Sequence, residues 1–80
     1  MKVVVNISLK FGVLDPQGKA VNHALHTMGF DSIKSVRVGK QIVLDMQDDT
    51  DENILKNVTL MCESLLANTV IEDYTIEIVR

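Results

Sequence analysis

The residues of this chain that could take part in catalysis or bind a metal are few: two histidines, one cysteine and four serines. His23 and His26 lie three residues apart, a spacing at which two imidazoles can share a metal ion. No cysteine, aspartate or glutamate of the same predicted helix joins them, which favours solvated surface histidines. Cys62 lies in an apolar stripe and is expected to be a small core residue. The serines lack any histidine–carboxylate framework that sequence can show, so no catalytic set is predicted.

The acidic residues also have simple structural interpretations. Glu72 and Asp73 are adjacent, and neighbours in a strand point to opposite faces, so they are not expected to form a carboxylate pair. Asp15 is predicted to cap a helix, and the acidic run 48–52 is predicted to be a solvated helix start, which the helix dipole favours. By these residues alone, the chain is a non-catalytic binding or assembly module.

Composition limits the partners and the compartment of the protein. Eighty residues make one domain with a modest core, and such a chain gains stability from oligomerisation. The formal net charge of −3 argues against nucleic acid or an anionic membrane as a partner, because both select a basic face. A lone cysteine cannot form an internal disulfide, and the sequence shows neither a membrane span nor a signal-peptide pattern. These features predict a soluble cytoplasmic protein.

Two segments are predicted to be helices. Asp15 and Pro16 form a strong start signal for the first, and Gly29 is expected to end it. Gly18 lies in the first turn, where glycine costs about 1 kcal/mol relative to alanine, so close approach of another backbone or a ligand is expected there. The second helix follows the acidic run and has one apolar stripe, formed by Ile54, Leu55, Val58, Met61, Cys62, Leu65 and Leu66.

Alternation of apolar and polar residues predicts four strands, over residues 2–10, 33–38, 41–47 and 72–79. Gly39 and Lys40 are predicted to form a hairpin turn between the middle two strands. Arg37 and Lys40 then flank the turn, where they could bind a phosphate or a partner's carboxylate. A solvated hairpin tip fits these two residues equally well.

The element order βαββαβ predicts an α+β fold, a ferredoxin-like two-layer sandwich that forms a single domain over residues 1–80. In this fold both helices cover one face of a four-stranded antiparallel sheet. The other face carries Val4, Val43, Thr75 and Val79 among polar residues, which suits a subunit interface. We therefore expect a homodimer or homotetramer that assembles through the sheet or its edges. The two central strands contain no aromatic residue for base stacking, so RNA is not an expected partner.

Residues 65–74 are more specific than a helix-to-strand connection requires: Asn68 suits a left-handed helix end, and two β-branched residues follow before Glu72-Asp73-Tyr74. Preceded by Cys62-Glu63-Ser64, this stretch resembles a signature of the PurS family, the small subunit of bacterial phosphoribosylformylglycinamidine synthase. Residues 13–18 with Ala20-Val21 resemble the start of the family's first helix, and residues 36–40 resemble its hairpin. Because the three motifs occur in order over essentially the whole chain, the resemblance is specific.

The resemblance implies an activity that belongs to a complex of three chains. A glutaminase subunit frees ammonia from glutamine, and a synthetase subunit uses ATP and Mg to activate formylglycinamide ribonucleotide. Ammonia then gives formylglycinamidine ribonucleotide, a step of de novo purine synthesis. The small subunit is required for this carbon–nitrogen ligase, but it has no catalytic residues and binds no cofactor of its own. It is expected to bridge the other two subunits and to support ammonia transfer.

Two segments are expected to contact the large subunit, the turn 15–18 and the connection 68–74, with Arg37 and Lys40 as weaker candidates. The predicted interface residues are Asp15, Gln17, Gly18, Arg37, Lys40, Asn68, Thr69, Glu72, Asp73 and Tyr74. Two other functions stay open. One is a stand-alone dimeric regulatory module that binds an amino acid or nucleotide near Gly12 and Gly18. The other is a purely structural oligomer.

Overall fold

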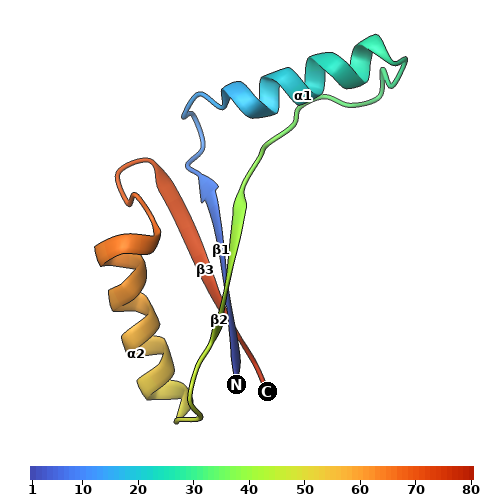
Figure 1. Ribbon diagram of the computed structural model, residues 1–80. Helices are drawn as coiled ribbons and strands as arrows, with labels where there is room; N and C mark the ends of the chain where they lie inside the picture. Colours follow the sequence, from blue (N-terminus) through green and yellow to red (C-terminus); the bar gives the residue numbers. More distant parts are fainter.

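A three-stranded antiparallel sheet forms the centre of the computed structural model, which describes all 80 residues (Figure 1). In spatial order the strands are β2 (Lys40–Asp45), β1 (Lys2–Leu9) and β3 (Glu72–Val79). Val5 of β1 lies opposite Ile42 of β2 and Ile76 of β3. The three side chains share one apolar face, as the alternation predicts. The α+β class is therefore confirmed, with three of the four predicted strands.

The core lies between this face of the sheet and helix α2 (Asp51–Met61), which continues as a π-helical turn over Cys62–Leu66. Alternate residues of β1 and the apolar stripe of the helix supply the most buried side chains, which are Val3, Val5, Ile7, Ile54, Val58 and Cys62. Burying one aliphatic side chain of this size contributes about 1.5–3 kcal/mol. The prediction that Cys62 is a core residue is confirmed.

Helix α1 (Pro16–Thr27) has the predicted ends but not the predicted position. Asp15 is its N-cap, and Gly29 follows its end with φ of 97°, a conformation that glycine adopts readily. The helix projects away from the sheet instead of covering it beside α2 (Figure 1). The prediction that both helices cover one sheet face is therefore wrong for the single chain, in which only α2 does so.

Residues 33–38 do not form the predicted fourth strand, and Gly39 and Lys40 do not form a hairpin turn. The segment runs back along α1 as extended chain that does not pair with β2 (Figure 1). His26 Nε2 lies 2.7 Å from the carbonyl oxygen of Ile33, and the N–H of Val38 donates to Asp15. The backbone of this segment is thus bonded to the helix at Ile33 and to the helix cap at Val38. We call α1 with its cap and the returning segment, residues 15–39, the α1 arm.

The projecting arm makes the single chain elongated and poorly buried. Its Cα radius of gyration is 16.0 Å, whereas a compact 80-residue domain has about 11.6 Å. Its accessible surface is 5870 Å², against about 4,800 Å² for a compact monomer of this mass. The difference of about 1,000 Å² is surface that a compact chain of this size would bury.

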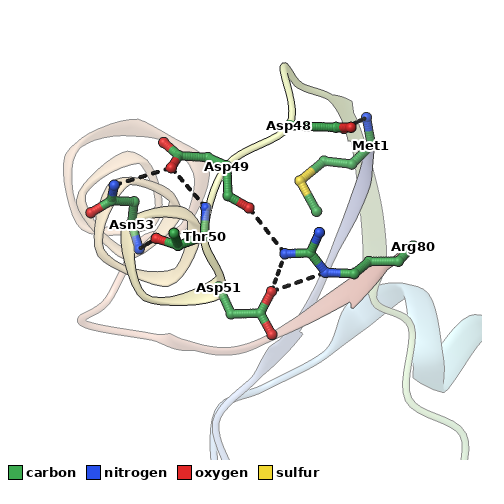
Figure 2. A network of polar contacts seen from close by, with 7 residues as sticks. All are labelled: Met1, Asp48, Asp49, Thr50, Asp51, Asn53 and Arg80. Carbon is green, nitrogen blue, oxygen red and sulfur yellow. Dashed lines mark hydrogen bonds and ion pairs between the residues drawn. The ribbon is translucent and has the colours of Figure 1, made fainter.

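A polar network fixes the end of the chain to the entrance of α2 (Figure 2). Arg80 pairs with Asp51 and also donates to the carbonyl oxygen of Asp49 at 3.0 Å. The Asp49 side chain accepts hydrogen bonds from the N–H of Thr50 and the amide of Asn53, which hold the pKa of its carboxyl below its ordinary value. The acidic run is therefore a helix start, as predicted, and it also anchors β3.

Candidate partner-binding surface

Asp15 joins the start of α1 to the chain that enters β2. One carboxylate oxygen accepts the N–H of Gly18 at 2.8 Å, and the other accepts the N–H of Val38 at 2.9 Å. The side chain is buried although it is charged. The hydrogen bonds from Val38 and then Gly18 lower the pKa of the Asp15 carboxyl, because they favour its ionised form. Asp15 is thus a helix cap, as predicted, and a tertiary anchor, which spacing alone did not indicate.

Two glycines allow close backbone contacts beside this anchor. A Cβ atom at Gly18 would lie 2.3 Å from the carbonyl oxygen of Val36, and one at Gly39 would lie 2.6 Å from that of Ile7. Real Cβ atoms essentially never come so close. The helix therefore tolerates glycine at position 18 because the returning segment passes there, which confirms the expected close approach of another backbone.

Arg37 braces the turn between β1 and α1. Its Nη2 group donates to the carbonyl oxygens of Leu9 and Lys10, at 2.9 and 3.0 Å. The prediction that Arg37 lies beside a hairpin turn is wrong, because its segment returns along α1 and passes beside the end of β1. Its guanidinium is nevertheless still exposed, so it can also face a binding partner.

Asn68 organises the loop that precedes β3. Its backbone N–H donates to Glu72 Oε1 at 2.7 Å, and its carbonyl oxygen accepts the N–H groups of Ile71 and Glu72. Its side-chain oxygen accepts the N–H of Val70 at 3.2 Å. The expected left-handed conformation is absent, since no residue other than glycine has positive φ and the chain leaves the helix in extended form at Ala67. Asn68 therefore builds a turn and does not end the helix.

Lys40 and Glu72 link the outer strands at the same end of the sheet. The Lys40 Nζ atom lies 3.8 Å from Glu72 Oε2, although β1 separates the two strands. Further along β3, the Tyr74 hydroxyl donates to Glu63 Oε2 of the π-helical turn at 3.1 Å. Partial burial raises the pKa of Tyr74, and the bond to Glu63 adds to this effect. These contacts place polar groups at fixed positions around the strand ends.

Most of the predicted interface residues line three clefts at the end of the sheet nearest α1. Asp15, Gln17, Lys40 and Glu72 line a cleft of about 260 Å³. A second, of about 380 Å³, is lined by Lys40, Asp73 and Tyr74, and a third, of about 460 Å³, by Gly18 and Arg37 among others. Asn68 and Thr69 are exposed in the neighbouring loop. The structure thus gathers the predicted set around the end of the sheet where the α1 arm begins.

Four exposed apolar residues at this end fall outside the predicted set: Phe11, Leu14, Val70 and Ile71. Phe11 is fully exposed, and Val70 is 81% exposed. A signal for Phe11 was available in the sequence, because a large apolar side chain beside Gly12 belongs to neither the strand nor the helix pattern. Val70 is in phase with the apolar positions of the following strand, so the sequence pattern does not show that it lies in a loop.

The side chains of this surface are suited to hydrogen bonding and to apolar contact. No group of three or more histidine, cysteine, aspartate or glutamate side chains could hold a metal ion. His23 and His26 are exposed, and His26 contacts Ile33. Neither helix is long and apolar enough to cross a membrane. What the arrangement offers chemically is a fixed set of hydrogen-bonding groups and exposed apolar side chains.

Comparison with known sequences gives one consistent family. The model of the family described as PurS, phosphoribosylformylglycinamidine (FGAM) synthase, matches residues 2–80. The chain is 54% identical over 78 residues to the PurS subunit of this synthase from Bacillus subtilis, covering 96% of this chain and 90% of that one. It is 42% identical over 77 residues to the Methanocaldococcus jannaschii subunit, covering 96% and 93%.

Solved structures agree with this family. The Bacillus subtilis PurS structure superposes with a TM-score of 0.83 at 52% identity, covering 99% of this chain and 98% of that one. PurS from Methanocaldococcus jannaschii, described as one of the subunits of formylglycinamide ribonucleotide amidotransferase, gives 0.85 at 42% identity, with 95% and 92% covered. A chain in the PurLQS structure from Thermotoga maritima gives 0.85 at 29% identity, with 95% and 93% covered.

Proposed function

The chain belongs to the PurS family of phosphoribosylformylglycinamidine synthase, and we propose that it is the non-catalytic subunit that bridges the glutaminase and synthetase subunits of this ligase. It is a subunit of FGAM synthase, which acts in purine biosynthesis. The observation that carries the bridging role is the likeness to a chain of the PurLQS structure. The end of the sheet nearest α1, which is rich in fixed polar groups and exposed apolar side chains, supports the same role.

In this proposal the chemistry belongs to the partner subunits. The glutaminase subunit frees ammonia, and the synthetase subunit holds ATP and Mg and converts formylglycinamide ribonucleotide to formylglycinamidine ribonucleotide. This chain binds no cofactor, works in the cytoplasm, and supports ammonia transfer by holding the two partners together. The scattered serines and histidines and the buried Cys62 fit a role without a nucleophile.

The chain acts as a homo-oligomer in which a second copy supplies what the single chain lacks. An apolar cleft of about 550 Å³ between β2 and α2 is uncovered, and Leu60 and Leu65 at this cleft are strongly exposed. Val21 of α1 and Met28, its C-cap residue, are exposed as well. The α1 arm of a neighbouring copy would cover the cleft, and the free edge of β2 would be available for pairing. The ferredoxin-like layout with two helices and a fourth strand is then completed between copies.

Reconstitution tests the bridging role. Glutamine-dependent amidine formation with ATP and Mg is measured for the synthetase and glutaminase subunits of the same source, with and without this chain. We expect activity only when the chain is present, because glutamine-derived ammonia must reach the synthetase. Equal activity of the other two subunits alone would contradict the bridging role.

One observation favours the regulatory alternative and gives it a separate test. The cleft of about 460 Å³ between α1 and residues 34–37 is lined by Lys19 and Lys34, neither of which takes part in an ion pair. A regulator would bind ATP or glutamine on its own, and ligand at 100 times its Kd would stabilise the fold by about 2.7 kcal/mol. For a bridging subunit we expect no shift in melting temperature with either compound.

A further inference from the structure

Two contacts hold the α1 arm at the points where it leaves the sheet and returns to it. Arg37, near the end of the arm, donates to the carbonyl oxygens of Leu9 and Lys10, where β1 ends. Asp15, at the start of the arm, accepts the N–H of Val38 at 2.9 Å. Because each contact joins the leaving chain to the returning chain, the arm can swing about these connections only if the contacts break. We call the side chains of Asp15 and Arg37 the hinge clamp.

The chain runs straight through the clamp, where the sequence pattern predicts a reversal. Residues 33–38 continue into β2 without changing direction (Figure 1). Gly39 lacks the positive φ that the common two-residue hairpin turns require at their first central position. It also passes so close to β1 that an added Cβ would lie 2.6 Å from the carbonyl oxygen of Ile7, and Lys40 is already paired with Ile7. Residues 33–45 are therefore one extended segment with Gly39 at its middle.

An extended segment of this kind is complementary to a second copy of itself. Two such segments that cross antiparallel at Gly39 would bring residues 33–38 of each copy against β2 of the other. The two stretches match in length, since β2 has six residues, and the edge of β2 that faces away from β1 is free. Because α1 lies along residues 33–38, it would reach the side of the neighbour that carries the apolar cleft. One chain thus supplies both halves of a two-fold interface.

The exposed surface of the chain also fits a second copy as the occupant of the cleft. The chain exposes about 1,000 Å² more than a compact chain of its mass, and a stable interface buries about 800 Å² of each partner. Exposed apolar side chains occur on both halves, with Val21 and Met28 on the arm and Leu60 and Leu65 at the cleft. Exchange of arms between two copies accounts for the excess surface with residues that this chain contains.

We propose that the hinge clamp selects the chain on which the arm docks, holding the arm open so that it covers the cleft of a second copy and not that of its own chain. This inference rests on the homo-oligomer proposed above and adds the residues that select it. In the closed alternative, residues 33–38 turn back at Gly39 and Lys40 and pair with β2 of the same chain, as the sequence pattern predicts. Both forms place the same arm on the same cleft, which is the condition for exchange of an element between copies.

The clamp distinguishes the two forms because only the exchanged form keeps it. A reversal at Gly39 carries Val38 away from Asp15, and it carries Arg37 away from the end of β1. The hydrogen bonds of the clamp therefore count against closure and in favour of exchange. Asp15 and Arg37 act here as positioning residues, since they fix the direction of the arm and leave the contact with the second copy to its apolar side chains.

The test measures the monomer–dimer equilibrium of full-length variants by analytical ultracentrifugation over a range of concentrations. Arg37→Ala removes the bonds to Leu9 and Lys10, and Asp15→Ser keeps a helix cap but lacks the second oxygen that Val38 uses. A hydrogen bond to a charged group is worth about tenfold in an equilibrium constant, and a dimer contains two clamps. We therefore expect each variant to raise the Kd of the dimer by about 100-fold.

Lys2→Ala is the matched control, because it also removes a positive charge and lies exposed at the other end of β1. It should leave the Kd unchanged, and circular dichroism should show the same helix content for all variants. Small-angle scattering then gives the shape of the monomers that the variants release. We expect a radius of gyration near the value of about 11.6 Å for a compact chain of 80 residues, because the freed arm closes on its own sheet.

Three results would overturn the inference, and they separate it from the proposed functions. If the Kd is the same in wild type, Arg37→Ala and Asp15→Ser, the clamp does not select the oligomer, although the oligomer itself stands. If the released monomers stay near the 16.0 Å of the open chain, the arm does not close and the choice between two docking sites is wrong. If wild type is monomeric at every concentration, the homo-oligomer fails and this inference fails with it, while reconstitution still decides the bridging role.

Discussion

Asp15 Oδ2 accepts a hydrogen bond from the N–H of Val38 at 2.9 Å, although the two residues are 23 positions apart in the chain. The same carboxylate caps α1 through Gly18. One side chain therefore fixes both ends of the α1 arm, where the chain leaves the sheet and where it returns to β2. The direction in which α1 projects from the sheet depends on this contact.

Replacing Asp15 with alanine removes a helix cap and leaves the Val38 N–H without its partner. We expect the melting temperature to fall by about 4–8 °C, the shift for a small domain that loses an interaction of this size. Thermal unfolding followed by circular dichroism measures it. Asp31→Ala is the control, because Asp31 is an exposed residue of the same arm. An unchanged melting temperature in Asp15→Ala would mean that the cap and anchor are not stabilising.

Stability should also depend on pH through Asp15 and Asp49. Hydrogen bonds lower the pKa of both carboxyls in the folded state below the ordinary value of 3.8. The folded state therefore binds protons less readily than the unfolded state, and the stabilisation is fully present above that value. It is lost as the pH falls below it through the folded pKa. Denaturant unfolding between pH 6 and 2.5 should show this loss, and Asp15→Asn should show a smaller one.

Gly18→Ala should destabilise the protein even though alanine is the better helix former. The added Cβ would lie 2.3 Å from the Val36 carbonyl oxygen, so the returning segment must move. We expect a loss of roughly 1–3 kcal/mol in unfolding free energy, as for other overpacked sites. His23→Ala, at an exposed position of the same helix, should be neutral or slightly stabilising. Equal stability of Gly18→Ala and His23→Ala would mean that the contact is not retained in solution.

The thiol of Cys62 should be unreactive until the protein unfolds. Its side chain is completely buried, and loss of water around it raises the pKa of the thiol, so little thiolate forms near neutral pH. Labelling with a thiol-reactive dye should be slow in buffer and fast in denaturant. Rapid labelling of the native protein would place Cys62 at a surface and contradict the described core.

Local patterns predicted the elements of this fold well. Alternation located β1 and β3, and the pair Asp15-Pro16 with Gly29 located α1, because strand faces and helix caps depend on neighbours in sequence. The fate of residues 33–38 could not be predicted in this way. The alternation of apolar and polar residues in this segment indicates extended chain, but it does not indicate which part of the protein the segment contacts. That depends on contacts between residues far apart in sequence, such as Val38 with Asp15.

The segments that the structure brings together at one end of the sheet were selected from the sequence, but the role of each side chain there was not. The signature residues Asn68 and Glu72 were expected to touch a partner, whereas in the structure their polar groups form hydrogen bonds within the loop itself. Spacing in sequence cannot separate a residue that makes a contact from one that builds the loop around it. The hydrogen bonds within the loop distinguish them, and these bonds are known only from the structure.

The strand order β2-β1-β3 has a consequence for how the chain folds. β1 is made first and lies in the middle of the sheet, so both of its neighbours are made later. Leu9 and Glu72, which are paired in the sheet, are 63 positions apart. Val3, Val5 and Ile7 therefore lack their full cover until almost the whole chain has left the ribosome. Closing so long a loop is slow, and the new chain exposes an aggregation-prone strand until β3 arrives.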